Sequence, residues 1–220
     1  MTKSRAVTDA QKEARRADIL KVAAHRFTLT PYDSLSMADT ADEAGVAKGT
    51  LYLYFKSKEE MFLAIYTDQL SAWFDELDQG LRQPGGDASV TGFLKLLGDS
   101  LVSRPELLRL IAILHTKLES NVDAATARKF RLWLDERRRA TGTLLEKRAL
   151  FLKPGQGADL LQQIHVLVIG FQHLAEPAGG MREALAAPDM AGHRVLLRES
   201  LLRTLNTLLT GLAYESKYQK

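Results

Sequence analysis

Residues 36–62 read SMADTADEAGVAKGTLYLYFKSKEEMF, and this stretch decides the fold. Ser36 followed by Asp39 resembles a capping box, which predicts the start of a short helix. Gly45 is placed to end that helix in the left-handed conformation. A second short helix is expected over about 48–54, so the stretch predicts two helices joined by a glycine turn.

The second of these helices presents a surface rich in hydrogen-bond donors. Leu51 and Phe55 are four residues apart, so they share a face that can be buried. An ammonium, a hydroxyl and two phenols project from the other sides, at Lys48, Thr50, Tyr52 and Tyr54. Gly49 leaves the first backbone N–H groups open to a phosphate, and Lys58 adds a cation just past the helix. These groups suit phosphate oxygens and base edges, whereas the two tyrosines taken alone also fit ordinary packing aromatics.

Helical periodicity continues on both sides of this stretch. An amphipathic helix is predicted from residue 8 or 9 to about 28, with Ile19, Ala23 and Phe27 on one apolar stripe. Ser57 and Glu60 form a capping box that starts a long helix to about 81. Further helices are expected over 88–102, 105–118, 122–151, 157–175 and 190–213, with a short turn of helix over 181–186. The sequence therefore predicts an all-α fold.

Composition narrows the class of protein. The chain has 220 residues and is 45% apolar, which is enough for a sizeable buried core. It contains no cysteine, so disulfide frameworks, thiolate metal sites and cysteine nucleophiles are excluded. The first residues lack the apolar core of a signal peptide, and no apolar run approaches the roughly 20 residues that span a bilayer. A cytoplasmic protein without a membrane segment is expected.

The net charge of +3 lies entirely in the first quarter of the chain. Residues 1–58 carry ten Lys and Arg against seven Asp and Glu, whereas residues 59–220 carry twenty of each. A basic end beside a neutral body is typical of a head that binds a polyanion. An excess of three charges also fits an ordinary solvated surface, so the charge alone does not decide between the two.

The stretch from residue 14 to 66 resembles the DNA-binding signature of the tetracycline-repressor (TetR) family. The matching residues are Ala23-Ala24 with Phe27, Ser36, Thr40-Ala41, Ala44-Gly45-Val46, Lys48-Gly49-Thr50-Leu51-Tyr52, Tyr54-Phe55 and Lys58-Glu59 with Phe62. Two positions depart from the family pattern. Pro31-Tyr32 replaces the usual Gly-Tyr or Gly-Phe, and Ala47 stands where a capping Ser is common. Alanine is a poor N-cap and offers no hydroxyl to a phosphate.

The resemblance implies an omega-shaped homodimer of about nine helices per subunit. A helix-turn-helix DNA-binding domain would occupy 1–56, and a ligand-binding and dimerisation domain 57–220. The two long helices over about 157–175 and 190–213 would form the dimer interface. The helix over 57–81 would link the two domains and act as the lever between effector and DNA.

The resemblance also implies a function: a transcriptional regulator, not an enzyme, that binds a palindromic operator on double-stranded DNA. It implies a repressor released by a small apolar or amphipathic effector, with no cofactor and no metal. The expected DNA contacts are Ser36, Lys48, Gly49, Thr50, Tyr52, Tyr54 and Lys58. Contacts with the flanking DNA backbone are expected of Arg15, Arg16, Lys3 and Arg5.

The effector site is indicated only by aromatic or polar residues on otherwise apolar helices. Each of these residues also fits plain core packing. The candidates are Trp73, Phe93, His115, Phe130, Trp133, Arg137, His165 and Phe171. Gly170 inside its helix suggests a close helix approach, either at the dimer interface or within one subunit.

Four alternatives to a ligand-released repressor are a metal-binding protein, an enzyme, an architectural DNA binder and an activator. A metal site has only the pairs His115 with Glu119 and His173 with Glu176, and structural sites need three or four ligands. An all-helical enzyme would need a nucleophile with a base or paired Glu-x-x-His motifs, which the sequence lacks. A non-specific architectural DNA binder would carry a larger basic excess. An activator of the same fold remains an alternative, because the sequence does not separate it from a repressor.

Overall fold

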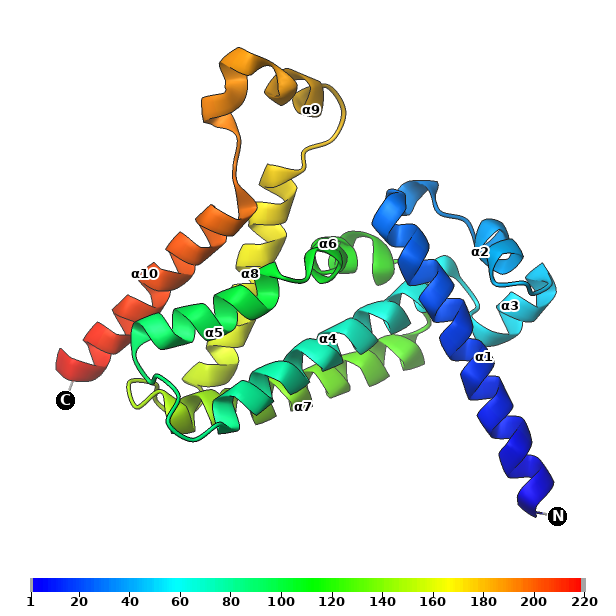
Figure 1. Cartoon of the computed structure of the whole chain (residues 1–220), viewed down its shortest axis with the longest axis horizontal. Coiled ribbons are helices and arrows are strands. Elements are labelled where there is room, and N and C mark those ends of the chain that lie inside the picture. Colours follow the sequence, from blue (N-terminus) through cyan, green and yellow to red (C-terminus); the bar gives the residue numbers. More distant parts are fainter. Residues whose placement is uncertain (1, 219–220) are drawn as a thin grey trace. The chain divides into compact units, whose positions relative to one another are not determined.

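A computed structural model describes the backbone of residues 2–218 and the side chains of residues 9–218. This part of the chain is helical, without strands, which confirms the all-α prediction (Figure 1). The α-helices are α1 (Thr2–Leu29), α2 (Met37–Glu43), α3 (Lys48–Tyr54), α4 (Lys58–Arg82), α5 (Val90–Val102), α6 (Pro105–Ile113), α7 (Ala124–Arg148), α8 (Gln156–Ala175), α9 (Gly179–Ala186) and α10 (Leu197–Tyr218). Short helices of other types are η1 (Tyr32–Ser34), η2 (Leu114–Leu118) and η3 (Pro188–His193).

The helix count differs slightly from the expected nine, because α9 is a regular helix where only a turn was predicted. α1 begins earlier than predicted, since residues 2–8 contain neither Pro nor Gly to stop it. α10 begins at Leu197 instead of about 190, because Pro188 starts the 3-10 helix η3 and the chain then extends. The predicted helix over 105–118 divides at Ile113, after which η2 adopts π-helical turns.

The chain forms two compact units. The first unit, here called the head, contains the described residues up to Asp68 together with Leu114–Ala127. Its core includes the predicted stripe of α1, where Ile19, Ala23 and Phe27 are buried. Phe27 and Tyr32 both make edge-to-face contacts with Phe62 of α4. This aromatic cluster ties α1 to the start of α4 within the head.

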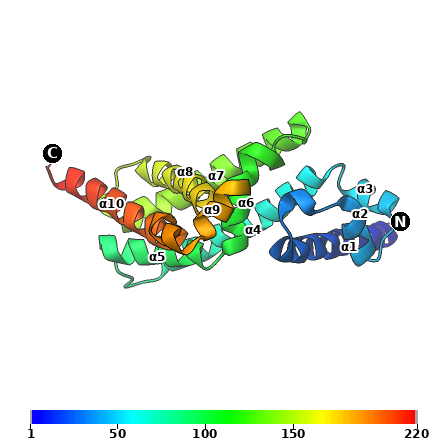
Figure 2. The same cartoon turned by 90° about the horizontal axis from the view of Figure 1, so that it is seen from above.

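The second unit, here called the body, contains Gln69–Ile113 and the described residues from Arg128 onward. α5 and α8 both pack against α10, and α6 packs against α8 (Figures 1 and 2). α4 and α7 contact through a buried polar pair, in which Thr141 Oγ1 donates a 2.6 Å hydrogen bond to Asp78 Oδ1. Among the described residues, every helix is too short or too polar to span a lipid bilayer.

Two glycines allow α7 and α8 to approach closely in the body. A Cβ placed on Gly157 of α8 would lie 2.2 Å from the backbone oxygen of Gly142 in α7. Both residues are buried, so side chains at either position would separate the two helices. Gly170 is exposed, and an added Cβ would meet no atom within 4 Å beyond its chain neighbours and the helix backbone. Close packing within one subunit therefore does not account for Gly170.

Candidate nucleic-acid interface

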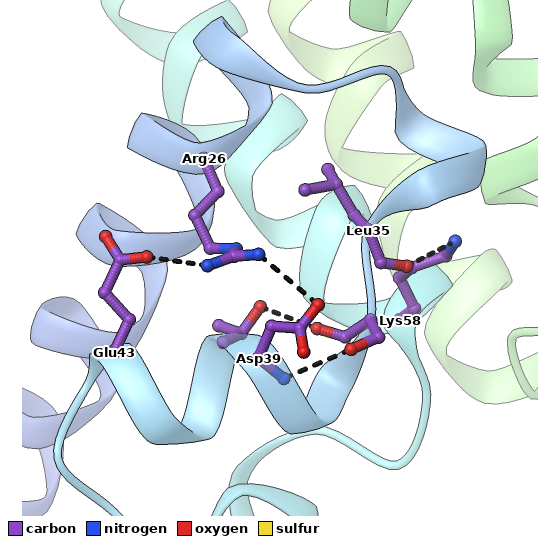
Figure 3. Close-up of polar contacts among 7 residues, drawn as sticks. Arg26, Leu35, Asp39, Glu43 and Lys58 are labelled. Atoms are coloured by element: carbon purple, nitrogen blue, oxygen red, sulfur yellow. Dashed lines mark hydrogen bonds and ion pairs between the residues drawn. The ribbon is translucent and has the colours of Figure 1, made fainter.

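The first two helices of the head are held together by ion pairs (Figure 3). Arg26 of α1 donates to Glu43 at 2.7 Å and to Asp39 at 3.4 Å, both on α2. The Ser36 hydroxyl accepts a 3.1 Å hydrogen bond from the backbone N–H of Asp39, which confirms the predicted N-cap. These contacts fix the start of α2 and its distance from α1.

The turn between α2 and α3 has the predicted left-handed glycine. Gly45 has φ of +64°. Its N–H donates to Asp42 O at 3.1 Å, and the N–H of Val46 donates to Ala41 O at 3.0 Å. These two bonds form a Schellman motif, which satisfies carbonyls at the end of α2. Because φ is positive, a side chain at residue 45 would strain the turn and the orientation of α3.

α3 buries one side and exposes the other. Leu51 is fully buried and Phe55 just after the helix is 2% exposed, as their spacing predicts. Lys48, Gly49 and Tyr52 are exposed, whereas Thr50 and Tyr54 are half-buried. The exposed side also carries Leu53, which is 85% exposed and was not among the predicted contacts. The sequence gives no sign of this exposure, because a leucine within a helix is as compatible with burial as with exposure.

Tyr54 faces a groove between α1 and α3. This groove has a volume of about 480 Å³ and is lined by Gln11, Lys12, Ala14, Arg15, Asp18 and Tyr54. Arg15 and Lys12 therefore accompany Tyr54, as a flanking phosphate contact would require. Arg16 instead packs its guanidinium over the Phe55 ring, with 5.3 Å between Cζ and the ring centroid. The side chains of Lys3 and Arg5 lie outside the described residues.

Lys58 is engaged within the head. Its Nζ donates 3.0 Å hydrogen bonds to the carbonyls of Tyr32 and Leu35 (the Leu35 bond is drawn in Figure 3) and lies 4.2 Å from the Tyr32 ring centroid. The Tyr32 hydroxyl donates to Glu59 Oε1 at 3.1 Å. Burial and the Glu59 carboxylate raise the pKa of Tyr32 far above its usual value. Lys58 thus holds the rebuilt loop after α1 against the start of α4.

A distant segment of sequence completes the head. Lys117 Nζ lies 2.8 Å from Asp33 Oδ1, and Asn121 O accepts a 2.9 Å bond from the Ser57 hydroxyl. Lys56 Nζ lies 2.9 Å from Asp123 Oδ2. Hydrogen bonding from the Thr126 N–H, followed by that from Lys56, lowers the pKa of Asp123 to about 2. No local pattern in the sequence could indicate these pairs, because their partners lie more than 60 residues apart.

The predicted effector residues are distributed over both units. His115 lies in the head, with Nδ1 2.9 Å from Glu119 Oε2, and the other seven lie in the body. Trp73 is buried and its Nε1 donates to Ser100 Oγ at 3.0 Å. Phe130 and Trp133 contact each other, with 6.1 Å between ring centroids. Arg137 lies 2.8 Å from Asp75 Oδ1, while His165 and Phe171 of α8 are half-buried.

One cavity of the body includes a predicted effector residue, Phe93. It has a volume of about 520 Å³ and lies against α4, α5 and the end of α7. Its lining residues are Glu76, Gly80, Gln83, Gly86, Asp87, Thr91, Gly92, Phe93, Lys95, Leu96, Asp99, Ser100 and Arg148. Among the described residues there is no cluster of three or more metal-ligating His, Asp or Glu side chains.

Family models match nearly the whole described chain. The model for bacterial regulatory proteins of the tetR family matches residues 19–65. The model described as tetracyclin repressor-like, C-terminal domain, matches residues 67–215. The two matches meet within α4.

Several relatives among curated proteins are named as HTH-type transcriptional regulators. YfiR of Bacillus subtilis (strain 168), itself uncharacterised, is 34% identical over 95 residues, 43% of this chain and 46% of that protein. The repressor KstR2 of Mycolicibacterium smegmatis is 34% identical over 91 residues, 41% of this chain and 42% of that protein. The activator FasR of the same species is 38% identical over 72 residues, 33% and 31% of the two chains. Each match spans less than half of the relative's length.

Solved structures share the fold at low identity. A tetR-family transcriptional regulator from Streptomyces coelicolor superposes with a TM-score of 0.57 at 17% identity, covering 94% of this chain and 84% of that one. A TetR transcriptional regulator from Rhodococcus sp. RHA1 has a TM-score of 0.50 at 20% identity, covering 90% and 97%.

Proposed function

Because the chain belongs to the tetracycline-repressor-like (TetR) family of bacterial regulators, we propose that it is a sequence-specific, DNA-binding transcriptional regulator. The observation that carries this proposal is the arrangement of α3. One side of α3 is anchored in the head by Leu51, and the other presents Lys48, Gly49 and Tyr52 to solvent. A short helix held rigidly at a protein surface can enter the DNA major groove.

The predicted contacts receive different roles in this proposal. Lys48 and Tyr52 are exposed and suit phosphate oxygens, while Thr50 at the flank suits a base edge. Tyr54, beside Arg15 in the groove between α1 and α3, contacts the sugar-phosphate backbone of the DNA. Ser36 and Lys58 act mainly inside the head, since their polar atoms bind backbone groups there. In this proposal residues 1–56 form the DNA-binding domain, and residues 57–220 form the ligand-binding and dimerisation domain.

The family consists of dimeric regulators, and we assign the dimer interface of this chain to α8 and α10. Val166, Gly170 and Leu174 lie four residues apart on α8, and both apolar side chains are more than half exposed. On α10, Gly211, Tyr214 and Tyr218 are exposed along the helix. Such an apolar stripe buries its surface when it meets a second copy. A two-fold dimer would present two copies of α3 to a palindromic operator.

Regulation by a small effector is the finer part of the proposal. An effector that binds the body better in one spacing of the two α3 helices shifts the population toward or away from DNA. Repression released by an apolar or amphipathic effector is the first candidate. Activation is the second, because relatives are named as a repressor and as an activator. α4 contributes residues to both units and is the proposed lever.

A pair of variants tests whether α3 reads sequence. Tyr52→Phe removes a hydroxyl aimed at phosphate and should weaken binding to operator and random DNA by the same factor. Thr50→Ala removes a group aimed at a base edge and should weaken operator binding more than random binding. Both affinities are measured at one fixed salt concentration, because phosphate contacts depend on salt. Equal losses on both DNAs for Thr50→Ala would count against base reading by Thr50.

A further inference from the structure

The side chain at the centre of the outward face of α3 is apolar. Leu53 is 85% exposed, more than Tyr52 at 44% on the same helix. Successive residues of an α-helix are about 100° apart, so a residue two positions after the buried Leu51 points to nearly the opposite side. Phe55, two positions further, is again buried. Leu53 therefore points directly away from the core of the head.

The space around Leu53 is open. Gly49 lies one helical turn earlier on the same face, and a methyl group added there would meet no atom within 4 Å beyond its chain neighbours and the helix backbone. Gly49 itself therefore places no side chain beside Leu53 on this face. Tyr52 and Thr50 flank the face on its two sides, so a surface that approaches α3 meets Leu53 between two groups able to form hydrogen bonds.

The chemistry of the major groove offers one apolar partner for such a side chain. Base edges there present hydrogen-bond donors and acceptors, except for the C5-methyl group of thymine. A leucine against a donor or an acceptor would strip it of water without replacing the hydrogen bond. A leucine against the methyl group removes apolar surface of both from water.

We propose that Leu53 is a specificity-determining residue that packs on the C5-methyl group of a thymine in the operator. This inference rests on the proposed function, because it requires α3 to enter the major groove. It adds a sequence requirement that the polar residues of α3 do not provide. Each half-site should contain a thymine, at one fixed position, that is required for its methyl group.

Replacing single thymines by deoxyuridine tests this directly, since the two differ only by that methyl group. The operator is first selected from random DNA, and duplexes are then made with one substitution in each half-site. At one position the wild-type chain should lose about fourfold in affinity per half-site, the effect of one buried methyl group. Leu53→Ala should bind the thymine operator more weakly and bind both duplexes equally well.

Leu29→Ala is the matched control, because Leu29 is also in the head, is 74% exposed and lies at the end of α1. This variant should keep the wild-type ratio between thymine and deoxyuridine. Thermal unfolding of both variants should match wild type, as expected for exposed side chains. The inference is overturned if Leu53→Ala retains the wild-type ratio at every thymine, even though the operator is bound. Absence of any selected operator would instead remove the proposed function, and this inference with it.

Discussion

Two lysines of the head differ in what their ammonium groups contact. Lys48 is exposed at the start of α3, where a phosphate can reach it. Lys58 is half-buried and donates to the carbonyls of Tyr32 and Leu35. Both were predicted to contact DNA, because a sequence shows that a cation is near the helix but not which acceptors surround it. The DNA contact of each lysine remains a prediction, and the geometry favours a structural role for Lys58.

The first prediction separates these roles by salt dependence. Each phosphate contact contributes about 0.9 to the slope of log affinity against log salt concentration. Lys48→Ala should reduce that slope by about 1 per subunit and leave the stability of the chain unchanged. Lys58→Ala should leave the slope unchanged and lower the free energy of unfolding by about 1–2 kcal/mol, because it removes two hydrogen bonds.

The slope is measured by fluorescence anisotropy over a series of salt concentrations, and stability by urea unfolding. Each variant serves as the control for the other. A reduced slope with unchanged stability for Lys58→Ala would assign that ammonium to DNA instead of to the loop after α1.

The exposure of the Leu53 side chain could not be predicted from the sequence. The spacing of Leu51 and Phe55 correctly predicts the buried side of α3. The prediction then credits only the polar residues on the remaining sides. Leu53 becomes conspicuous when its exposure is known, because exposure depends on how α3 packs in the head and not on residue type.

At the scale of elements, the short helices were predictable because capping and turn residues mark their ends. Ser36 and Gly45 give the bounds of α2 almost to the residue, and α3 was predicted at the observed bounds. The starts of α1 and α10 were not predictable. No capping residue marks the start of α1, and the segment before α10 contains competing Pro and Gly turns. The pairing of residues 114–127 with the head depends on tertiary contacts, which sequence spacing does not reveal.

The second prediction concerns the N-cap of α3. Ala47 has the extended backbone of an N-cap, with φ of −63° and ψ of 144°, but has no side-chain acceptor. Ala47→Ser should raise the free energy of unfolding by roughly 0.5–1 kcal/mol, because its hydroxyl can accept from the start of α3. The opposite change in α2, Ser36→Ala, should lower it by about 1 kcal/mol. Urea unfolding measures both, and a destabilised Ala47→Ser would contradict the assigned cap.

The third prediction concerns the free energy of unfolding at low pH. Asp123 precedes α7 and accepts a 2.8 Å bond from the N–H of Thr126, and its pKa is lowered from 3.8 to about 2. A carboxyl whose pKa is lowered in the folded state stabilises the fold above its unfolded pKa, and this contribution disappears as pH falls through the folded value. The stability difference between wild type and Asp123→Asn should be constant above about pH 5 and shrink as pH falls toward 2.

This difference is followed by urea unfolding at a series of pH values. Asp189→Asn, which makes the same carboxyl-to-amide change in η3 of the body, is the matched control. A difference for Asp123→Asn that persists unchanged to pH 2 would show that the carboxylate is not the group responsible.

At the scale of the whole molecule, one chain leaves apolar surface on α8 that its own fold does not cover. Val166 is 59% exposed and Leu174 is 57% exposed, with Gly170 open between them. The broad apolar content of this helix was visible in the sequence. Which part of it faces outward was not, because α6 and α10 cover only some of its sides.

The fourth prediction is that this surface holds the dimer together. Val166→Glu places a charge in the proposed interface and should convert the dimer to a monomer at micromolar concentration, because an unpaired charge is costly to bury. Leu150→Glu is the control, since Leu150 is 88% exposed and lies outside α8 and α10. Sedimentation velocity measures both. If Val166→Glu forms dimers with wild-type affinity, the dimer interface does not include Val166.

Selection of bound fragments from random double-stranded DNA shows whether this chain recognises an operator with two-fold symmetry. The full chain is freed of bound small molecules by unfolding and refolding, and selection is carried out at about 150 mM salt with excess competitor DNA. We expect an inverted repeat whose half-sites are about one helical turn, or a multiple of it, apart. A folded protein that enriches no shared sequence, or enriches one without two-fold symmetry, would contradict this expectation.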